Sequence, residues 1–241
     1  MESTTVPPRN IEEDIAEIYR PSTKSALWHK YSFLQGCIVD LQGLIAAGKT
    51  TIGLSLCEFL TQLGFDVVWY PEQIPKHLLG LYGKDMGRYA FPFQVIVADN
   101  RKAVHAEAVK KCKGKIVLTD RGLLGDYVFA LMQYRKGYFT EKEFEAYLEG
   151  VKTELPEPDF VLYPEINPEV AFERMFKRGV EEEKASYTLE YFEEVHKTYQ
   201  EVMNVYGKAI VVPWGESQEL INGRLSAQKC QDILDRLKER L

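Results

Sequence analysis

The stretch GLIAAGKT, at residues 43–50, decides the fold of this 241-residue chain. It matches the phosphate-binding pattern G-x-x-x-x-G-K-[ST] at every fixed position, and it follows directly on the apolar run CIVDL at residues 37–41. Glycines in such a loop let successive backbone N–H groups point at the phosphates of a nucleotide. The sequence therefore predicts a phosphate-binding loop between a strand and a helix.

Each part of this loop has an expected role in binding ATP and Mg²⁺. The Lys49 ammonium is placed to bind the β and γ phosphates, and the Thr50 hydroxyl is placed to ligate Mg²⁺. The residues expected to surround the nucleotide phosphates are Gly43, Ala46, Ala47, Gly48, Lys49, Thr50 and Thr51. Such a loop identifies phosphates and not chemistry, so a kinase, a switch and a motor all remain open at this point.

The composition narrows the classes of protein. A net charge of −6 and a pI near 5.4 argue against a nucleic acid as the main partner, because such binding needs a basic face. We see neither a signal region nor an apolar run near the length of about 18 residues that a membrane helix requires, so we expect an intracellular, cytoplasmic protein without a membrane partner. We expect one domain over residues 31–241 after an N-terminal extension over residues 1–30, in which residues 11–19 can form a short helix.

Apolar runs of strand length alternate with helix-length segments along the chain, which is typical of a parallel sheet covered by helices. The predicted strands are residues 36–41, 65–70, 115–119, 160–163 and 209–213, and the predicted helices are residues 49–63, 92–111, 123–134, 140–152, 168–177 and 189–205. Ligands of such sheets lie beyond the carboxyl ends of the strands. The residues that follow each strand are therefore the candidates for the site.

Two predicted strand ends carry charged residues suited to catalysis. Glu72, after the second strand, is the candidate general base that accepts the proton of an acceptor alcohol. At the end of the third strand, Asp120 is the candidate for binding Mg²⁺, and Arg121 for holding phosphate or orienting Glu72. The alternative interpretation of Glu72 is a solvated loop glutamate or a helix N-terminal charge.

The helix predicted from residue 92 carries a mixed stripe on one face. The stripe is formed, at i, i+3, i+4 and i+7, by Gln94, Val97, Ala98 and Arg101. An amide, two apolar residues and a guanidinium together suit the edge and the faces of a planar base. Asp126 is the expected carboxylate partner of a half-buried Arg101. Alternatively, Gln94 and Arg101 extend into solvent.

A lid over the phosphates is predicted near residues 174–187. Arg174 and Arg178 lie one helical turn apart on one face. Arginines at the end of a mobile helix can close over a triphosphate and stabilise the charge of the phosphoryl group in transfer. The alternative is an exposed helix with ion pairs such as Glu173 with Lys177.

These motifs together resemble the deoxycytidine, deoxyguanosine and mitochondrial thymidine kinase family of deoxynucleoside kinases. The resemblance spans most of residues 36–206 and rests on the ordered segments GLIAAGKT, YPEQ, RYAFPFQ, TDRGLLGDYVFA, PDFVLYPEINPE and RMFKRGVEEE. It implies a P-loop kinase fold with a parallel five-stranded sheet flanked by helices, and a homodimer. The implied reaction is the ATP-dependent phosphorylation of the 5′-hydroxyl of a deoxynucleoside substrate.

The resemblance also implies roles for single residues. Glu72 is similar to the family's base at the 5′-hydroxyl, and Gln94 to its base-pairing amide. Arg121 would hold the 5′-hydroxyl end, and Tyr82 and Glu183 would contact the sugar 3′-hydroxyl.

The chain departs from the family pattern at three positions. Asp120 stands where many members have glutamate, and Val180 stands where members often carry another lid arginine. One residue is missing after Asp126, relative to the family pattern.

The base preference follows from the same resemblance. Members that prefer thymidine tend to have an apolar residue at the Arg101 position, so deoxycytidine or a purine deoxynucleoside is expected to be the better substrate. Three alternatives remain: a thymidine-preferring kinase, a thymidylate or other nucleoside monophosphate kinase, and a nucleotide-dependent switch. Glu72 would repel an acceptor phosphate, and the chain contains no Asn-Lys-x-Asp motif for guanine.

Overall fold

The computed structural model describes residues 25–215 and 220–241. The helix expected over residues 11–19 and most of the expected N-terminal extension lie outside the described residues. The strands are β1 (Ile38–Leu41), β2 (Val67–Tyr70), β3 (Ile116–Asp120), β4 (Phe160–Glu165), β5 (Ile210–Pro213), β6 (Leu220–Ile221) and β7 (Arg224–Leu225). The helices are α2 (Ala26–Tyr31), the 3₁₀ helix η1 (Ser32–Leu34), α3 (Lys49–Gln62), α4 (Lys76–Lys84), α5 (Met86–Lys111), α6 (Leu123–Arg135), α7 (Glu141–Val151), α8 (Pro168–Arg178), α9 (Glu181–Ser186), α10 (Leu189–Tyr206) and α11 (Ala227–Lys238).

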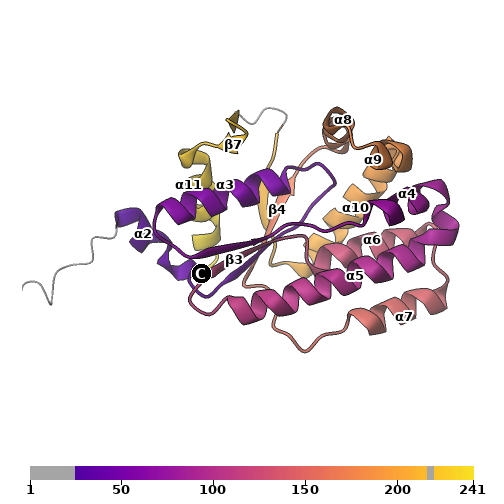
Figure 1. The fold of residues 1–241 in the computed structure, drawn as a ribbon, viewed down its shortest axis with the longest axis horizontal. Coiled ribbons are helices and arrows are strands. Elements are labelled where there is room, and N and C mark those ends of the chain that lie inside the picture. The colour runs from indigo at the N-terminus through magenta and orange to yellow at the C-terminus, as the bar shows by residue number, and fades with distance from the viewer. Residues whose placement is uncertain (1–24, 216–219) are drawn as a thin grey trace, which may run out of the picture.

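Five parallel strands form the central sheet, in the order β2-β3-β1-β4-β5 (Figure 1). β1 lies in the middle, where Val39 is paired with Leu118 of β3 and with Phe160 of β4. β1 and β3 are buried at every position, as expected of parallel strands with helices on both faces. The predicted α/β class with a five-stranded parallel sheet is confirmed.

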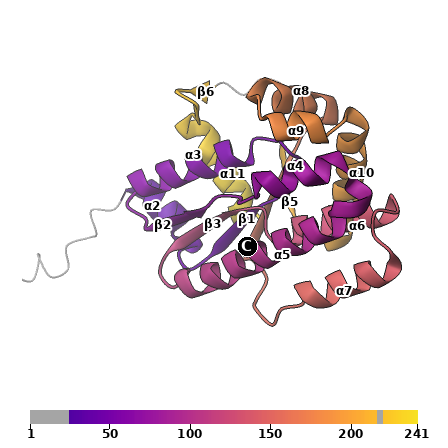
Figure 2. The same ribbon diagram turned by 45° about the vertical axis from the view of Figure 1, so that its right-hand side comes forward.

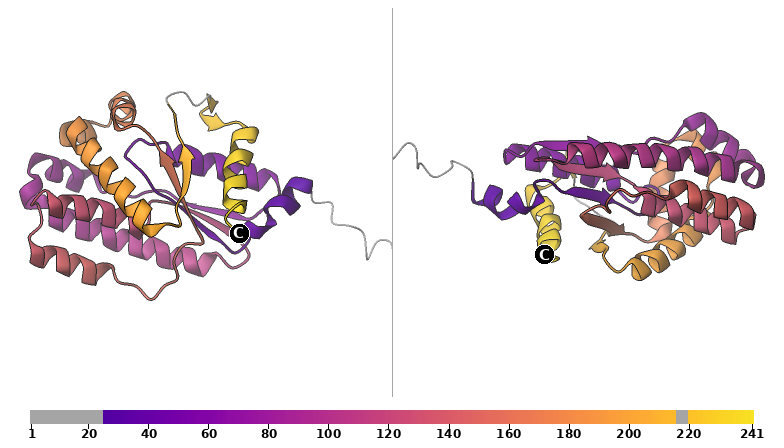
Figure 3. Two further views of the ribbon diagram at one scale, coloured as in Figure 1. Left: turned by 180° about the vertical axis from the view of Figure 1, so that it is seen from behind. Right: turned by 90° about the horizontal axis from the view of Figure 1, so that it is seen from below.

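Helices cover both faces of this sheet. α3 contacts β2, β3 and α11 on one face, while α5, α6 and α10 form a layer on the other, with α7 packed on α5 and α6 (Figures 1 and 3). α4, α8 and α9 lie together beyond one end of the sheet (Figure 2). That is the end at which β1, β2 and β3 finish, so these three helices stand over the expected site. Among the described helices, none is long and apolar enough to cross a membrane.

The prediction that the second long helix begins at Pro92 is wrong. α5 runs from Met86 to Lys111 with Pro92 inside it, and the Asp85 carboxylate accepts a hydrogen bond from the Arg88 amide as N-cap. Proline favours a helix start because it lacks an N–H group. Here the Asp85 cap lies upstream of Pro92, and α5 also packs against α4. The helix therefore includes Pro92, although the proline cannot donate a backbone hydrogen bond.

The sequence pattern also missed α4, a nine-residue helix with two glycines. Glycine lowers helix propensity, so this segment lacks a strong helical pattern. Its Gly83 is needed for packing, because a Cβ there would lie 1.9 Å from the Ser186 hydroxyl oxygen of α9. The same close approach fixes α4 against the segment predicted to be a lid. β6, β7 and α11 near the carboxyl end were likewise not predicted.

Candidate active site

A cavity of about 600 Å³ lies beyond the carboxyl ends of β1, β2 and β3. Most predicted site residues line it: Ala46, Gly48, Lys49, Thr50, Thr51, Glu72, Gln94, Val97, Arg101, Asp120, Arg121, Arg174, Arg178 and Glu183. The remaining five lie outside the lining, and they are Gly43, Ala47, Tyr82, Ala98 and Asp126. The cavity therefore joins the predicted phosphate loop, strand ends, helical stripe and lid in one space.

The phosphate loop connects β1 to α3, as predicted. Gly48 has a φ of 91°, and a Cβ at this position would lie 2.7 Å from the Nε1 atom of Trp214. Both the backbone conformation and the nearby indole therefore require glycine. Lys49 Nζ donates a hydrogen bond to the Leu44 carbonyl at 2.9 Å. Burial, with the neighbouring charge of Arg121, lowers the pKa of Lys49 to about 8, so an entering anion would be a favourable partner.

Thr50 and Asp120, the two predicted metal ligands, lie side by side. The Thr50 hydroxyl donates to Asp120 Oδ2 at 2.7 Å. Asp120 Oδ1 is buried and has no hydrogen-bond partner in the described part of the chain. A carboxylate oxygen left unpaired beside a hydroxyl is a set of hard oxygen donors, which fits Mg²⁺. The shorter aspartate in place of glutamate still reaches the threonine.

Glu72 lies between two buried arginines. Its Oε1 atom is 2.6 Å from Arg101 Nη2 and 2.9 Å from Arg121 Nε. Burial alone would raise the pKa of Glu72, but the positive charges of Arg121 and Arg101 outweigh it and lower the pKa to about 2. The carboxylate is therefore ionised at neutral pH, the state that a general base needs. The alternative of a solvated loop glutamate does not fit this pairing.

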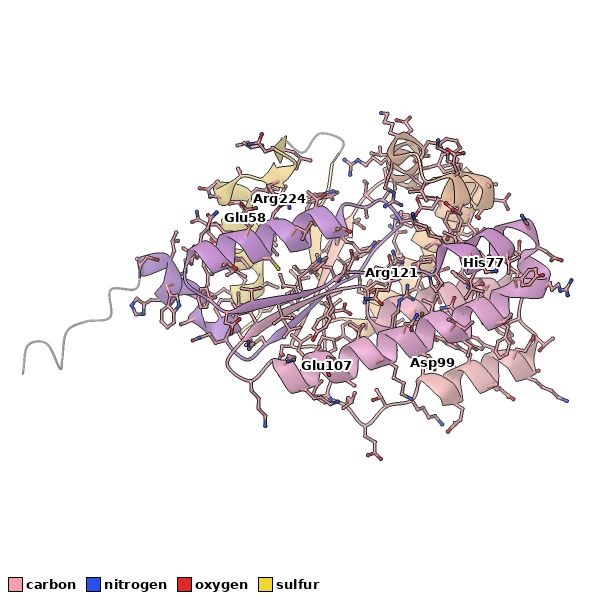
Figure 4. All side chains as sticks on the ribbon, viewed as in Figure 1. Glu58, His77, Asp99, Glu107, Arg121 and Arg224 are labelled. Atoms are coloured by element: carbon pink, nitrogen blue, oxygen red, sulfur yellow. The ribbon has the colours of Figure 1, made fainter. Side chains whose placement is uncertain are left out.

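Arg121 is held in an uncommon backbone conformation at the end of β3. Its φ is 69°, in the left-handed region that arginine seldom adopts. The guanidinium lies over the Phe129 ring at 4.6 Å from the centroid, and Nη1 donates to the Tyr199 hydroxyl at 3.1 Å. Figure 4 shows Arg121 in the middle of the molecule, at the end of the sheet. Packing from several elements thus aims this side chain at Glu72.

The predicted base-reading stripe faces inward. Gln94 and Arg101 are only 2% and 9% exposed, so the alternative in which they extend into solvent is wrong. Arg101 Nη1 pairs with Asp126 Oδ1, which confirms the expected ion pair.

Asp126 lies outside the cavity lining. Its other carboxylate oxygen accepts a hydrogen bond from the Tyr147 hydroxyl at 2.7 Å, and the residue is fully buried behind Arg101. Asp126 was predicted to bind the substrate directly. Each carboxylate oxygen thus has a partner, and the ion pair helps to hold Arg101 in place, while a direct contact with the substrate stays a prediction.

A second amide, which sequence reasoning missed, lies beside Gln94. Gln94 Nε2 donates to the Asp126 carbonyl at 3.2 Å, while Gln133 Nε2 donates to Gln94 Oε1 at 2.7 Å and to the Phe129 carbonyl at 3.2 Å. Carbonyl oxygens only accept, so they fix the orientation of both amides. Gln133 lines the cavity, and its Oε1 has no partner among the described residues. Its spacing of seven residues from Asp126, two turns along α6, is the pattern that could have revealed it.

The segment predicted to be a lid covers one side of the cavity. Arg174 and Arg178 both line it, and Arg178 Nη2 lies 2.5 Å from Glu183 Oε2. On the exposed side of the same helix, Lys177 Nζ lies 3.9 Å from Glu173 Oε2. The expected ion pair between Glu173 and Lys177 is thus present on the exposed face, while closure of Arg174 and Arg178 over a triphosphate stays a prediction.

Tyr82 lies behind the cavity wall. Its ring stacks on Phe93 with centroids 5.0 Å apart, and its hydroxyl is 3.2 Å from the Tyr191 hydroxyl. Tyr187, just before the start of α10, and Tyr191, in its first turn, line the cavity. Tyr82 therefore supports the cavity wall from behind, and its predicted contact with the sugar stays a prediction.

Several known proteins are similar to this chain. The family model described as deoxynucleoside kinase matches residues 39–240. A deoxyadenosine kinase of Dictyostelium discoideum is 26% identical over 189 residues, which cover 76% of this chain and 74% of that protein. A probable deoxycytidine kinase of fowlpox virus is 30% identical over 169 residues, or 67% of this chain and 69% of that one. The solved structure of a deoxyadenosine kinase from M. mycoides with bound dATP has the same fold, with a TM-score of 0.65 at 22% identity over 84% of this chain and 99% of that chain. The chain belongs to the deoxynucleoside kinase family.

Proposed function

We propose that this deoxynucleoside kinase transfers the γ-phosphoryl group of ATP to the 5′-hydroxyl of its substrate with the help of Mg²⁺, and that deoxycytidine or a purine deoxynucleoside is preferred over thymidine. The observation that carries the proposal is the placement of Glu72. It faces the same cavity as the phosphate loop, ionised and paired with Arg101 and Arg121. A carboxylate in this position suits an uncharged alcohol as the acceptor.

The residues around Glu72 support the proposed reaction, and each has a distinct role in it. Glu72 would accept the proton of the 5′-hydroxyl, while Arg121 keeps the carboxylate ionised and in place. Lys49 and the backbone of the phosphate loop would bind the donor phosphates, and Arg174 and Arg178 would approach them from the lid. Bound Mg²⁺ neutralises charge on the phosphates, and Thr50 and Asp120 are the residues that would hold it.

The preference for the base rests on the groups left unpaired at the other end of the cavity. After its bonds to the Asp126 carbonyl and to Gln133, the Gln94 amide keeps one N–H and one lone pair. Gln133 Oε1 adds a second acceptor. Two acceptors favour a base with an exocyclic amine, because cytosine, adenine and guanine each offer at least two N–H donors whereas thymine offers one.

The charges in the cavity also weigh against the alternatives. A nucleoside monophosphate as acceptor would bring its phosphate next to the Glu72 carboxylate, and two like charges at such a distance repel. A nucleotide-dependent switch would not need the further part of the cavity that Gln94, Arg101 and Gln133 line. A thymidine-preferring kinase would leave the second acceptor in the base site unpaired.

The test is an incubation of the purified protein with labelled ATP and a panel of deoxynucleosides and monophosphates, followed by separation of the products. We expect label in the monophosphates of deoxycytidine or the purines, with lower kcat/KM for thymidine, and no transfer in the presence of excess EDTA. Transfer only to monophosphates, or ATP hydrolysis without transfer, would contradict the proposal. Light scattering of the same sample tests the homodimer expected from the family resemblance.

A further inference from the structure

The hydroxyl of Tyr199 lies outside the cavity lining and contacts two parts of the active site. Tyr199 lies on α10 and is fully buried. Its oxygen accepts a hydrogen bond from Arg121 Nη1 at 3.1 Å. Burial raises the pKa of Tyr199, while the Arg121 charge and the backbone N–H of Gly43 act in the opposite direction. The hydroxyl is therefore next to both the arginine that pairs with Glu72 and the first glycine of the phosphate loop.

The surroundings leave the Tyr199 side chain little freedom to move. Its ring stacks on Tyr163 with centroids 5.7 Å apart and meets the edge of Phe129 at 6.1 Å. On α6, a Cβ at Gly125 would lie only 2.8 Å from the Tyr199 hydroxyl. β4 and α6 thus fix the position of this oxygen, so a group bonded to it is fixed as well.

Arg121 needs such an anchor. Its backbone is in the left-handed region, and its ion pair with Glu72 must adjust when an acceptor hydroxyl bonds to the same carboxylate. The Tyr199 hydroxyl is neutral and lies outside the cavity lining, so no substrate competes for it. It can keep the guanidinium in place while Glu72 exchanges partners.

We propose that Tyr199 is a positioning residue for phosphoryl transfer, which holds Arg121 against Glu72 and in a fixed position relative to the phosphate loop. The inference rests on the proposed kinase function. Because transfer requires the acceptor oxygen and the donor phosphate to be aligned closely, a shift of this arginine is expected to slow the chemical step more than it weakens nucleoside binding.

The chain provides a matched control in Tyr163. This residue is also buried, and its ring is stacked on Tyr199. Its hydroxyl has no hydrogen-bond partner in the described part of the chain. Tyr199→Phe and Tyr163→Phe therefore remove the same atom from two neighbouring rings, and only one of these atoms is bonded to the arginine.

The experiment compares the two variants with the wild type. We expect Tyr199→Phe to lower kcat by roughly 10- to 100-fold, as for loss of a hydrogen bond to a charged group, with KM for the nucleoside changed less than about 3-fold. Tyr163→Phe is expected to leave both values within about 2-fold. A Tyr199→Phe variant with wild-type kcat, or equal losses in the two variants, would overturn the inference. If the wild type transfers no phosphate to any deoxynucleoside, the proposed function fails instead.

A double-mutant cycle separates positioning from mere packing. If Tyr199 acts through Arg121, adding Tyr199→Phe to Arg121→Lys costs less than about 2-fold further in kcat, because the interaction is already lost. The same 10- to 100-fold loss in both backgrounds would show that Tyr199 acts independently of the arginine. Melting temperatures of all variants are measured alongside, and kcat is compared well below the lowest of them.

Discussion

The substitution Glu72→Gln tests the centre of the proposed mechanism. The amide keeps the size of the side chain and an acceptor oxygen, but it cannot take a proton and carries no charge. Both arginines that pair with Glu72 keep another partner, since Arg101 remains bonded to Asp126 and Arg121 to Tyr199. We therefore expect the variant to fold and to bind nucleoside while its turnover falls.

The expected loss of turnover is roughly 10²- to 10⁴-fold, the usual contribution of a positioned general base. This corresponds to about 3 to 5 kcal/mol of transition-state stabilisation. Loss of nucleoside affinity should stay within a few fold, because the base and sugar are bound by other residues.

The same substitution has a consequence for stability that depends on pH. The pKa of Glu72 is lowered from an ordinary 4.5 to about 2 by its arginine neighbours, which outweigh the effect of burial. A pKa shift of this size corresponds to a stabilisation of the folded state by about 3 kcal/mol. Because the pKa is depressed in the folded state, this stabilisation is complete above about pH 4.5 and is lost as the pH falls toward 2. The difference in free energy of unfolding between wild type and Glu72→Gln should therefore be largest at neutral pH.

Three measurements check these expectations. Single-turnover kinetics give the chemical rate, equilibrium titration gives the nucleoside affinity, and urea unfolding at pH 7 and pH 3.5 gives the stability difference. Glu58→Gln is the control, because Glu58 is exposed and lies 3.4 Å from Arg224 on the outer surface, far from Arg121 (Figure 4). Equal losses of affinity and turnover would make Glu72 a binding residue, and an unchanged chemical rate would refute its role as base.

Three further variants test the two ends of the cavity. Lys49→Ala should abolish phosphoryl transfer with a melting curve close to that of the wild type, and near wild-type turnover would show that the loop is not the catalytic phosphate site. Arg101→Met with Asp126→Ala should move the ratio of kcat/KM toward thymidine by roughly 10-fold or more, and both changes are made together because Arg101→Met alone would leave the buried Asp126 carboxylate without a cationic partner. A wild type that strongly prefers thymidine would contradict this assignment. Gln133→Leu removes the second acceptor from the base site, so it should reduce the selectivity among bases by roughly 5- to 10-fold without lowering kcat on the best substrate, which a panel of kcat/KM values would show.

Local spacing in the sequence was enough to locate the phosphate loop, the parallel sheet and the residues at its edge. The glycines of GLIAAGKT determine a backbone path by themselves, and continuous apolar runs determine buried strands. Glu72, Asp120 and Arg121 follow strand ends directly, so their shared edge could be predicted from the order of the elements. Family resemblance added the kinase activity, which spacing alone left open.

The tertiary structure decided how these side chains pair, because each pair joins elements that are distant in sequence and meet only when helices pack. Glu72 is 29 residues from Arg101, and Arg121 is 78 residues from Tyr199. No local pattern encodes which oxygen a buried guanidinium will reach. The same packing placed Asp126 behind Arg101 and brought Gln133 beside the Gln94 amide, since unpaired polar groups in an interior are costly and neighbouring elements settle where they are satisfied.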